Sequence, residues 1–291
     1  MKHLPHIAAK LFATPTVLTP QHHSFLCGRL ESWLAGNTGG PSVRPVPKAH
    51  DDNPDLYDEE DAGTPDCRDN MGIKYRNNGT AAIIPVYGTL VAHPEDIAMS
   101  ECGCSMEGLG MMIDRVESNA RVEKTIYDFR TPGGAVTLIP ETGRKILNSR
   151  KETIAFTDSD CCSGGLWLAS QCQKFYATGS SNVGSCGVYT MCLDMSKALE
   201  KDGIQINAIH AGKFKLLGAY WKPLTAEERD ILQVGVDKIW MQFKDAIQVY
   251  RVIDDEDCGN GLVFDGETAV EKGFVDGLVE GIEDILDDMV E

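Results

Sequence analysis

The chain has 291 residues, enough to bury one large hydrophobic core, and its formal net charge is −17. This acidity argues against nucleic acid or an anionic membrane as a direct partner, because both repel a negative surface. No window holds the roughly 20 consecutive apolar residues of a membrane-spanning helix, so we expect no membrane anchor. The ten cysteines are scattered through a chain without a secretion signal, which favours free thiols in a reducing cytoplasm.

Two segments precede the part of the chain that has the pattern of a folded domain. Residues 1–35 form an N-terminal extension with modest helical periodicity, and residues 36–79 form an acidic linker rich in Pro and Gly. The linker contains the run Asp51–Asp61, and low hydrophobicity with dense like charge predicts a mobile segment. Residues 80–291 form the third region, which we expect to be one α/β domain.

From residue 80 onward, short apolar runs alternate with amphipathic stretches. Strands are expected at 81–87, 125–129, 153–156, 175–177 and 204–209, and helices at 109–117, 140–149, 164–172 and 195–201. Thr225 and Glu228 form a capping box at the start of a long helix, and 283–290 form an amphipathic C-terminal helix. The alternation predicts a layered α/β fold with largely parallel sheets and flanking helices.

The segment Asp160–Gly165 brings Ser163 to the start of an apolar helix. Gly164 and Gly165 let the backbone approach a ligand closely, and the helix N-terminus leaves N–H groups with positive partial charge. Such a position suits a serine whose attack on a carbonyl creates an oxyanion. A serine is also a good helix N-cap, so a capping role stays open.

Three further segments accompany Ser163 in a set order: Thr125–Gly134, Gly184–Val188 and Ala211–Lys215. Together the four segments resemble peptidase family S49, the signal-peptide-peptidase-A-like serine proteases, over residues 80 to 280. Leu4–Ala8 and the overall layout are similar to the phage branch of that family, the head maturation proteases. The resemblance implies a crotonase/ClpP-like fold for residues 80–291, and head-to-tail homo-oligomers.

A serine nucleophile needs a base, and two kinds of base are available. His93 and His210 lie in no triad pattern. A lysine amine has an unperturbed pKa of about 10.4, so it must be desolvated to act near neutral pH. Lys215 has apolar neighbours in sequence, which makes burial plausible, and the resemblance favours it over Lys213. The resemblance also implies that Ser185 hydrogen-bonds and orients the lysine, while a simple turn serine is the alternative.

Backbone donors are expected to stabilise the oxyanion. Gly164 follows the nucleophile, and the resemblance places a second donor in the Pro132–Gly134 turn, with Gly134 preferred and Gly133 next. Arg130 departs from the family pattern before this turn and is expected to alter substrate preference near the site.

Metal and cysteine chemistry are weaker alternatives. Cys102, Cys104, Cys161 and Cys162 lack the paired C-x₂-C spacing of structural zinc sites, so no metal is expected. Cys162 beside Ser163 is an alternative nucleophile, but a small buried thiol is the better interpretation.

The sequence therefore predicts a serine endopeptidase with a Ser163–Lys215 dyad and no cofactor. The phage resemblance implies prohead maturation by cleavage of scaffold and possibly portal or capsid proteins, in the host cytoplasm or inside the prohead. Three alternatives remain: a cellular S49 peptidase that degrades signal-peptide remnants, an acyl-CoA enzyme of the same broad fold, and a catalytically inactive shell component.

Overall fold

The computed structural model describes residues 16–18, 67–68, 71–96 and 103–287. Its main feature is a seven-stranded sheet in the order β14-β11-β9-β7-β4-β3-β2. The five strands from β14 to β4 are parallel, and β3 and β2 add an antiparallel edge. The strands are β2 Cys67–Arg68, β3 Lys74–Arg76, β4 Ala81–Tyr87, β7 Lys124–Arg130, β9 Glu152–Thr157, β11 Lys174–Ala177 and β14 Gly277–Leu278.

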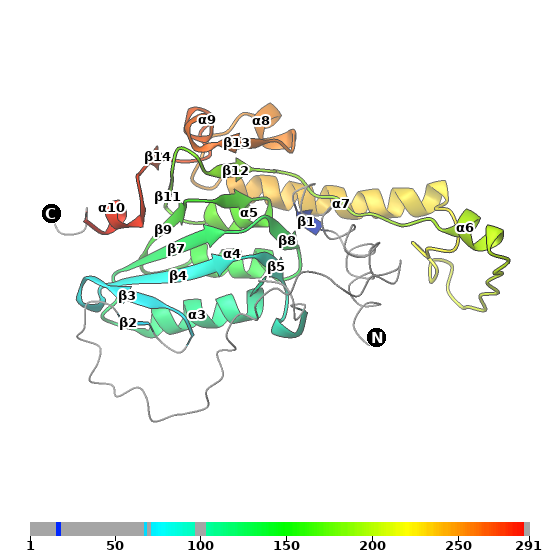
Figure 1. Ribbon diagram of the computed structural model, residues 1–291, viewed down its shortest axis with the longest axis horizontal. Helices are drawn as coiled ribbons and strands as arrows, with labels where there is room; N and C mark the ends of the chain where they lie inside the picture. Colours follow the sequence, from blue (N-terminus) through cyan, green and yellow to red (C-terminus); the bar gives the residue numbers. More distant parts are fainter. Residues whose placement is uncertain (1–15, 19–66, 69–70, 97–102, 288–291) are drawn as a thin grey trace, which may run out of the picture. The chain divides into compact units, whose positions relative to one another are not determined.

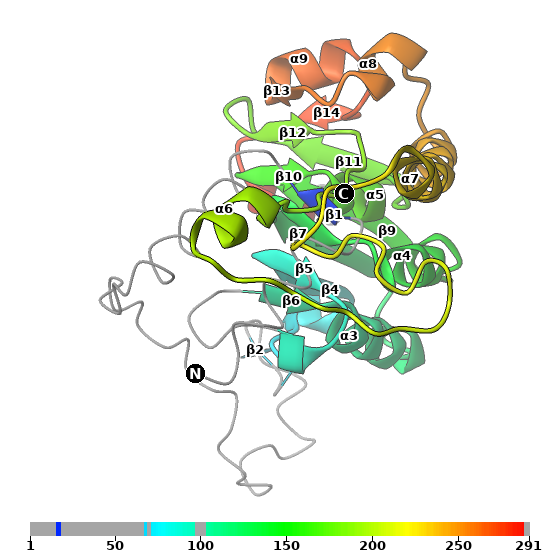
Figure 2. The same ribbon diagram turned by 90° about the vertical axis from the view of Figure 1, so that its right-hand side faces the viewer.

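Both faces of this sheet are covered. The helices α3 (Met106–Ser118), α4 (Ile139–Leu147) and α5 (Gly164–Ala169) lie side by side on one face (Figures 1 and 2). On the other face, alternate strand residues pack against α10 (Ile282–Asp287), because successive side chains of a strand point to opposite faces. That cluster comprises Ala81, Ile83, Ile126, Ile154, Phe156, Ile285 and Leu286. The expected layered α/β fold with largely parallel sheets and flanking helices is thus confirmed.

Two smaller sheets continue from the carboxyl ends of the central strands. One has the order β1-β8-β5-β6, and the other has the order β10-β12-β13. Their strands are β1 Thr16–Leu18, β5 Thr89–Val91, β6 Gly103–Ser105, β8 Gly133–Ala135, β10 Asp160–Cys162, β12 Asn182–Gly184 and β13 Val263–Asp265. Two short helices, α8 (Asp255–Gly259) and α9 (Gly266–Glu271), flank β13, and the 3₁₀ turns are η3 (Asn77–Gly79) and η4 (Pro94–Asp96). The small sheets place loops where parallel α/β folds bind ligands.

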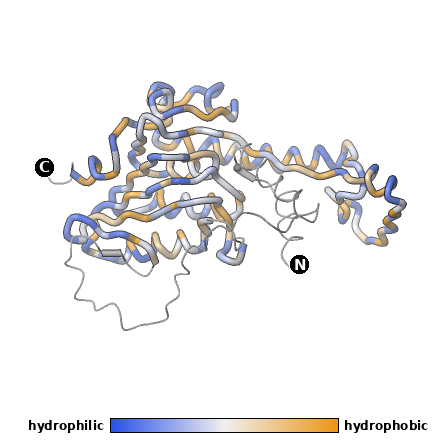
Figure 3. Tube along the Cα trace, in the orientation of Figure 1, coloured by the Kyte–Doolittle hydropathy of each residue, from blue (hydrophilic) through white to orange (hydrophobic). Residues whose placement is uncertain are grey.

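Residues 188–242 form a separate compact unit. It contains α6 (Ser196–Lys201) and most of α7 (Ala226–Ile247). The predicted capping box is confirmed, since Glu228 N–H donates to Thr225 Oγ1 at 3.2 Å and Thr225 N–H donates to Glu228 Oε2 at 3.0 Å. No apolar side chain of this unit is buried, and apolar residues recur along α7 among hydrophilic ones (Figure 3).

Most predicted elements from residue 80 to 187 match the structure within three residues at each end, and two expectations need correction. The strand predicted at 204–209 is absent: these residues are irregular, and Ile209 is fully exposed. A strand needs a partner edge, and residues 188–242 contain none. The strands β2 and β3 lie inside the segment expected to be a mobile linker. Despite their polar composition they are ordered, because β3 pairs with β4 and β2 pairs with β3. The remaining residues of 1–35 and of the linker up to residue 66 lie outside the described residues, apart from β1.

A buried arginine joins the C-terminal residues to α5. The Arg251 side chain is only 1% exposed. Its guanidinium donates to Ser170 O at 3.1 Å and Cys172 O at 3.4 Å, which lie just beyond the end of α5, and to Asp276 Oδ2 at 2.8 Å. The Asp276 carboxylate also accepts from Phe175 N–H at 2.6 Å. A cation at the end of a helix is stabilised by the helix dipole, so Arg251 and Asp276 together join the end of α5 to the start of β11.

We expect Arg251→Ala to lower the free energy of unfolding by about 3 kcal/mol, because it leaves buried carbonyls and a carboxylate without their charged donor. Chemical denaturation measures the loss. Arg144→Ala is the matched control, since Arg144 is exposed, forms its ion pair within the described residues with Glu141, and is expected to change stability by less than about 0.5 kcal/mol. Equal stability of the two variants would refute the role assigned to Arg251.

Candidate functional site

Ser163 lies on a strained turn between β10 and α5. Its backbone angles are φ 55° and ψ −116°, a region that side-chain-bearing residues rarely adopt. Ser163 N–H donates to Gly184 O at 2.8 Å, and Ser163 O accepts from Trp167 N–H at 3.0 Å in the first turn of the helix. Its hydroxyl makes no capping hydrogen bond in the described part of the chain, which removes the simple N-cap interpretation. A serine on a sharp strand-to-helix turn is the arrangement of known nucleophile elbows.

Ser185 occupies the equivalent place on the neighbouring strand. Because β10 and β12 are parallel and pair Cys162 with Gly184, Ser163 and Ser185 both follow directly from the same end of the sheet. Ser185 also has a positive φ of 57°, and its N–H donates to Leu262 O at 2.6 Å. Gly184, the residue before Ser185, must be a glycine, because a Cβ at this position would lie 2.4 Å from Leu262 O. The structure therefore brings together the two serines that the sequence singled out.

The Pro132–Gly134 turn leads into β8 beside this pair. Gly133 has a φ of +98°, and its N–H donates to Thr131 Oγ1 at 3.1 Å. Gly134 lies so close to β5 that an added Cβ would be 2.0 Å from Leu90 O. Thr131 also pairs with β10, since its N–H donates to Asp160 O at 2.6 Å and its carbonyl accepts from Cys162 N–H at 3.1 Å. Thr131 was not predicted as a site residue, although it directly precedes the turn.

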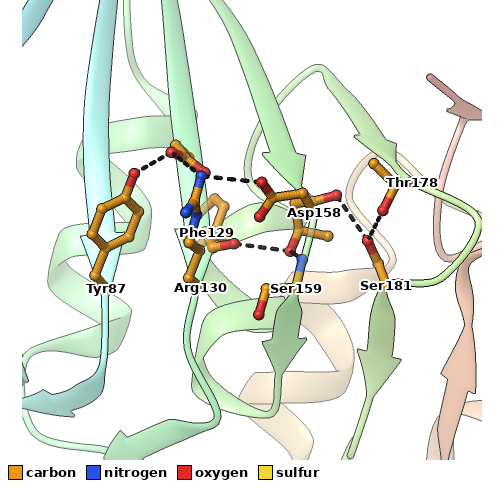
Figure 4. Close-up of polar contacts among 9 residues, drawn as sticks. Tyr87, Phe129, Arg130, Asp158, Ser159, Thr178 and Ser181 are labelled. Atoms are coloured by element: carbon orange, nitrogen blue, oxygen red, sulfur yellow. Dashed lines mark hydrogen bonds and ion pairs between the residues drawn. The ribbon is translucent and has the colours of Figure 1, made fainter. Parts of the chain in front are cut away.

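Charged side chains form a row across the carboxyl ends of β4, β7 and β9 (Figure 4). Arg130 pairs with Asp158 at 3.1 Å and with Asp128 at 3.5 Å, and lies over the Tyr87 ring at 5.0 Å from its centroid. The Tyr87 hydroxyl donates to Asp128 Oδ2. Burial raises the pKa of Asp128, while its hydrogen bond from Tyr87 and the nearby Arg130 lower it. Arg130 is thus held by its neighbours on the strand ends.

Beside this row, buried hydroxyl groups of Thr157 and Ser181 form hydrogen bonds between the ends of neighbouring strands (Figure 4). Thr157 Oγ1 donates to Phe129 O at 2.8 Å and accepts from Ser159 N–H at 3.2 Å. Ser181 Oγ donates to Thr157 O at 2.9 Å and shares a hydrogen bond with Thr178 at 2.8 Å. These bonds tie the end of β9 to β7 and to the residue before β12.

The candidate lysines belong to the other compact unit. Lys215 is exposed, so the apolar burial expected for it is not found among the residues that the structure describes, where Phe214 is itself 38% exposed. Lys213 pairs with Glu227 at 2.5 Å and lies over the Phe214 ring. His210 lies in the same unit as the lysines and is exposed, whereas His93 lies in the unit of the serines and forms an ion pair with Glu107 at 2.8 Å.

The cysteines beside Ser163 are poorly suited to nucleophilic attack. Cys161 and Cys162 are buried, and burial raises the pKa of the Cys162 thiol to about 12. A thiol that stays protonated at neutral pH is a weak nucleophile, which favours Ser163 over Cys162. Among the residues described, no three His, Cys, Asp or Glu side chains gather as metal ligands. Within the same residues, no helix has both the length and the apolar composition needed to span a membrane.

Comparison with known proteins identifies the family. A family model described as Peptidase family S49 matches residues 145–291, just over half of the chain and a range that includes Ser163, Ser185 and Lys215. The chain belongs to peptidase family S49. Gly133 and Gly134 lie before the matched range of this S49 chain.

Two curated phage proteins match nearly all of the S49 chain. It is 27% identical to capsid assembly protease C of Escherichia phage lambda, over 98% of this chain and 65% of that protein. It is 25% identical to head-tail preconnector protein GP5 of Enterobacteria phage P21, over 96% of this chain and 56% of that protein. The chain thus spans less than two thirds of the length of either relative. A solved structure of the 1510-N membrane-bound stomatin-specific protease is 13% identical with a TM-score of 0.43, covering 70% of this chain and 82% of that one.

We expect Gly134→Ala to lower the free energy of unfolding by about 2 kcal/mol, because the methyl group cannot fit 2.0 Å from Leu90 O without a backbone shift. Thermal denaturation measures the effect. Gly235→Ala on α7 is the control: a Cβ there meets nothing within 4 Å, and alanine stabilises a helix by up to about 1 kcal/mol. An unchanged melting temperature for Gly134→Ala would contradict the close approach of the two strands.

Proposed function

We propose that this S49 chain is a serine endopeptidase with Ser163 as nucleophile. The observation that carries the proposal is the strained turn at Ser163, paired strand to strand with the second positive-φ serine, Ser185. Backbone strain of this kind costs about 1–3 kcal/mol and concentrates at functional sites. A serine used only for capping gains nothing from such a conformation.

The reaction is an acyl transfer in two stages. The Ser163 oxygen attacks the carbonyl carbon of the scissile peptide, while Lys215 in its neutral form takes the hydroxyl proton. The N–H groups of Gly134 and Gly164 stabilise the oxyanion, and Lys215 returns the proton to the leaving amine as the C–N bond breaks. Water, deprotonated by the same amine, then attacks the acyl-serine ester, and the amine returns that proton to the Ser163 oxygen as the acyl–oxygen bond breaks. Ser185 accepts or donates a hydrogen bond that orients the lysine.

The contacts of the two lysines support Lys215 as the base. Lys213 is engaged in an ion pair with Glu227 at 2.5 Å. No ion pair to Lys215 is found among the described residues.

Lys215 is exposed in a single chain, and a second copy of the chain would bury it. Residues 188–242 bury no apolar side chain of their own and expose several large ones: Ile204, Ile206, Ile209, Phe214, Tyr220, Ile231, Val234 and Met241. Soluble monomers rarely leave so many apolar side chains uncovered. A head-to-tail homo-oligomer would cover them, and would let Ser163 of one protomer meet Lys215 of its neighbour.

The names of the two phage relatives support substrates of the virus shell. One is called a capsid assembly protease and the other a head-tail preconnector protein. We therefore propose prohead maturation, with scaffold and possibly portal or capsid protein as substrates, in the host cytoplasm or inside the prohead. Degradation of signal-peptide remnants is the second candidate, because a putative signal peptide peptidase SppA of Enterococcus faecium is 26% identical over 61% of this chain.

Ser163→Ala and Lys215→Ala are each expected to abolish peptide hydrolysis with the fold intact, whereas Lys213→Ala keeps substantial activity. Hydrolysis of a scaffold-derived peptide measures activity, a fluorophosphonate probe tests covalent labelling of Ser163, and circular dichroism checks folding. A wild-type protein that neither hydrolyses peptide nor takes the probe would contradict the peptidase proposal. An inactive Lys213→Ala beside an active Lys215→Ala would reassign the base.

Mixing the inactive Ser163→Ala and Lys215→Ala proteins is expected to restore part of the activity. If the dyad forms between protomers, about one interface in four of a random equal mixture pairs an intact serine with an intact lysine. A dyad within one chain restores nothing, because no protomer in the mixture holds both groups. Mass spectrometry verifies that mixed oligomers form, so an inactive mixture rules out the arrangement between protomers.

A further inference from the structure

Thr131 is the point at which three parts of the site meet. It lies between the last residue of β7 and the Pro132–Gly134 turn, and it is 0% exposed. All of its polar groups are engaged. Its backbone N–H and carbonyl bond to Asp160 and Cys162 of the nucleophile strand, at 2.6 and 3.1 Å.

The Thr131 hydroxyl has one donor and one acceptor partner. It donates to Gly88 O at 2.6 Å and accepts from Gly133 N–H at 3.1 Å. A hydroxyl with both bonds satisfied has a fixed orientation. Gly133 N–H is therefore turned toward Thr131 and is not free for an oxyanion, whereas Gly134 N–H does not bond to this hydroxyl.

The methyl group of Thr131 packs against the nucleophile helix. A Cβ added at Gly165 would lie 2.4 Å from Thr131 Cγ2, so the first turn of α5 sits directly on this side chain. Side chains alternate along a strand, and Arg130 therefore points to the α10 face while Thr131 points to the α5 face. The pairing of Arg130 with Asp128 and Asp158 fixes the strand end from the opposite face.

We infer that Thr131 is a positioning residue that selects Gly134 as the oxyanion donor and sets its place relative to Ser163. Its hydroxyl fixes the turn and its backbone fixes the nucleophile strand, while its methyl group only packs against the helix that supplies Gly164. The inference rests on the proposed peptidase function. Oxyanion donors act only when held within a few tenths of an ångström of their target, and a displacement of about 1 Å can cost a factor of 10² in rate.

Thr131→Val tests the role of the hydroxyl, because it keeps the branched shape and removes both side-chain hydrogen bonds. Thr157→Val is the matched control. Thr157 is also 0% exposed, ends the adjacent strand, and likewise donates to one backbone carbonyl and accepts from one backbone N–H, but it does not contact the glycine turn. Thr131→Ser keeps the hydroxyl and removes only the methyl group.

We expect Thr131→Val and Thr157→Val to lose similar stability, since each leaves the same groups unpaired. Only Thr131→Val is expected to lose kcat, by about 10²-fold, with KM and the fold unchanged. Thr131→Ser is expected to retain most of the wild-type kcat. A kcat for Thr131→Val close to that of Thr157→Val would overturn the inference.

Hydrogen exchange in the wild-type protein tests the same contact without any substitution or activity. Gly133 N–H is expected to exchange slowly, because it is bonded to a buried hydroxyl, and to exchange at least tenfold faster in Thr131→Val. Rapid exchange of Gly133 in the wild type overturns the inference, whether or not Thr131→Val folds. Failure of the peptidase proposal gives a different result. The wild-type protein would then neither hydrolyse peptide nor take the fluorophosphonate probe, while its Gly133 N–H could still exchange slowly.

Discussion

Two backbone hydrogen bonds hold the candidate site in shape, and the rest of the arrangement depends on them. Ser163 N–H is bonded to Gly184 O, and Ser185 N–H is bonded to Leu262 O. Each serine has a positive φ that would be rare in a free chain, at a cost of about 1–3 kcal/mol. The ladder from β10 through β12 to β13 offsets this cost and leaves both hydroxyls at the same end of the small sheet.

The strand ends behind the serines are fixed from two faces. On the α10 face, Arg130 bridges the carboxylates of Asp128 in β7 and Asp158 just after β9, and Tyr87 of β4 joins the same row. On the α5 face, Thr131 joins the glycine turn to the nucleophile strand. A strand end held from one face alone can still rotate about its axis, whereas one held from both faces cannot. The Pro132–Gly134 turn is therefore tied to the central sheet through the end of β7.

The local parts of this architecture were predictable from the sequence, and the parts made by distant contacts were not. The β10–α5 turn could be predicted because a polar strand end, Ser163 and two glycines follow one another in the sequence. The N-terminal cap of α7 could be predicted because Thr225 and Glu228 are three residues apart. The bonds of Thr131 reach Gly88 and Asp160, and no local pattern reveals such partners. The same reason explains the false strand at 204–209: alternating isoleucines suggest a strand, but pairing depends on an edge elsewhere. The polar residues of β3 gave no signal, yet β4 orders them.

The hydrogen bond from Ser185 to Leu262 also bears on when the site can form during translation. Leu262 lies 99 positions after Ser163, and β13 follows it directly. The ribosome releases a chain from its N-terminus, so Ser163 leaves the tunnel long before the strand that completes its sheet. Until then Ser185 has no partner to hold its positive φ. The backbone pairing that holds both serines is therefore complete only after Leu262 and β13 have been synthesised.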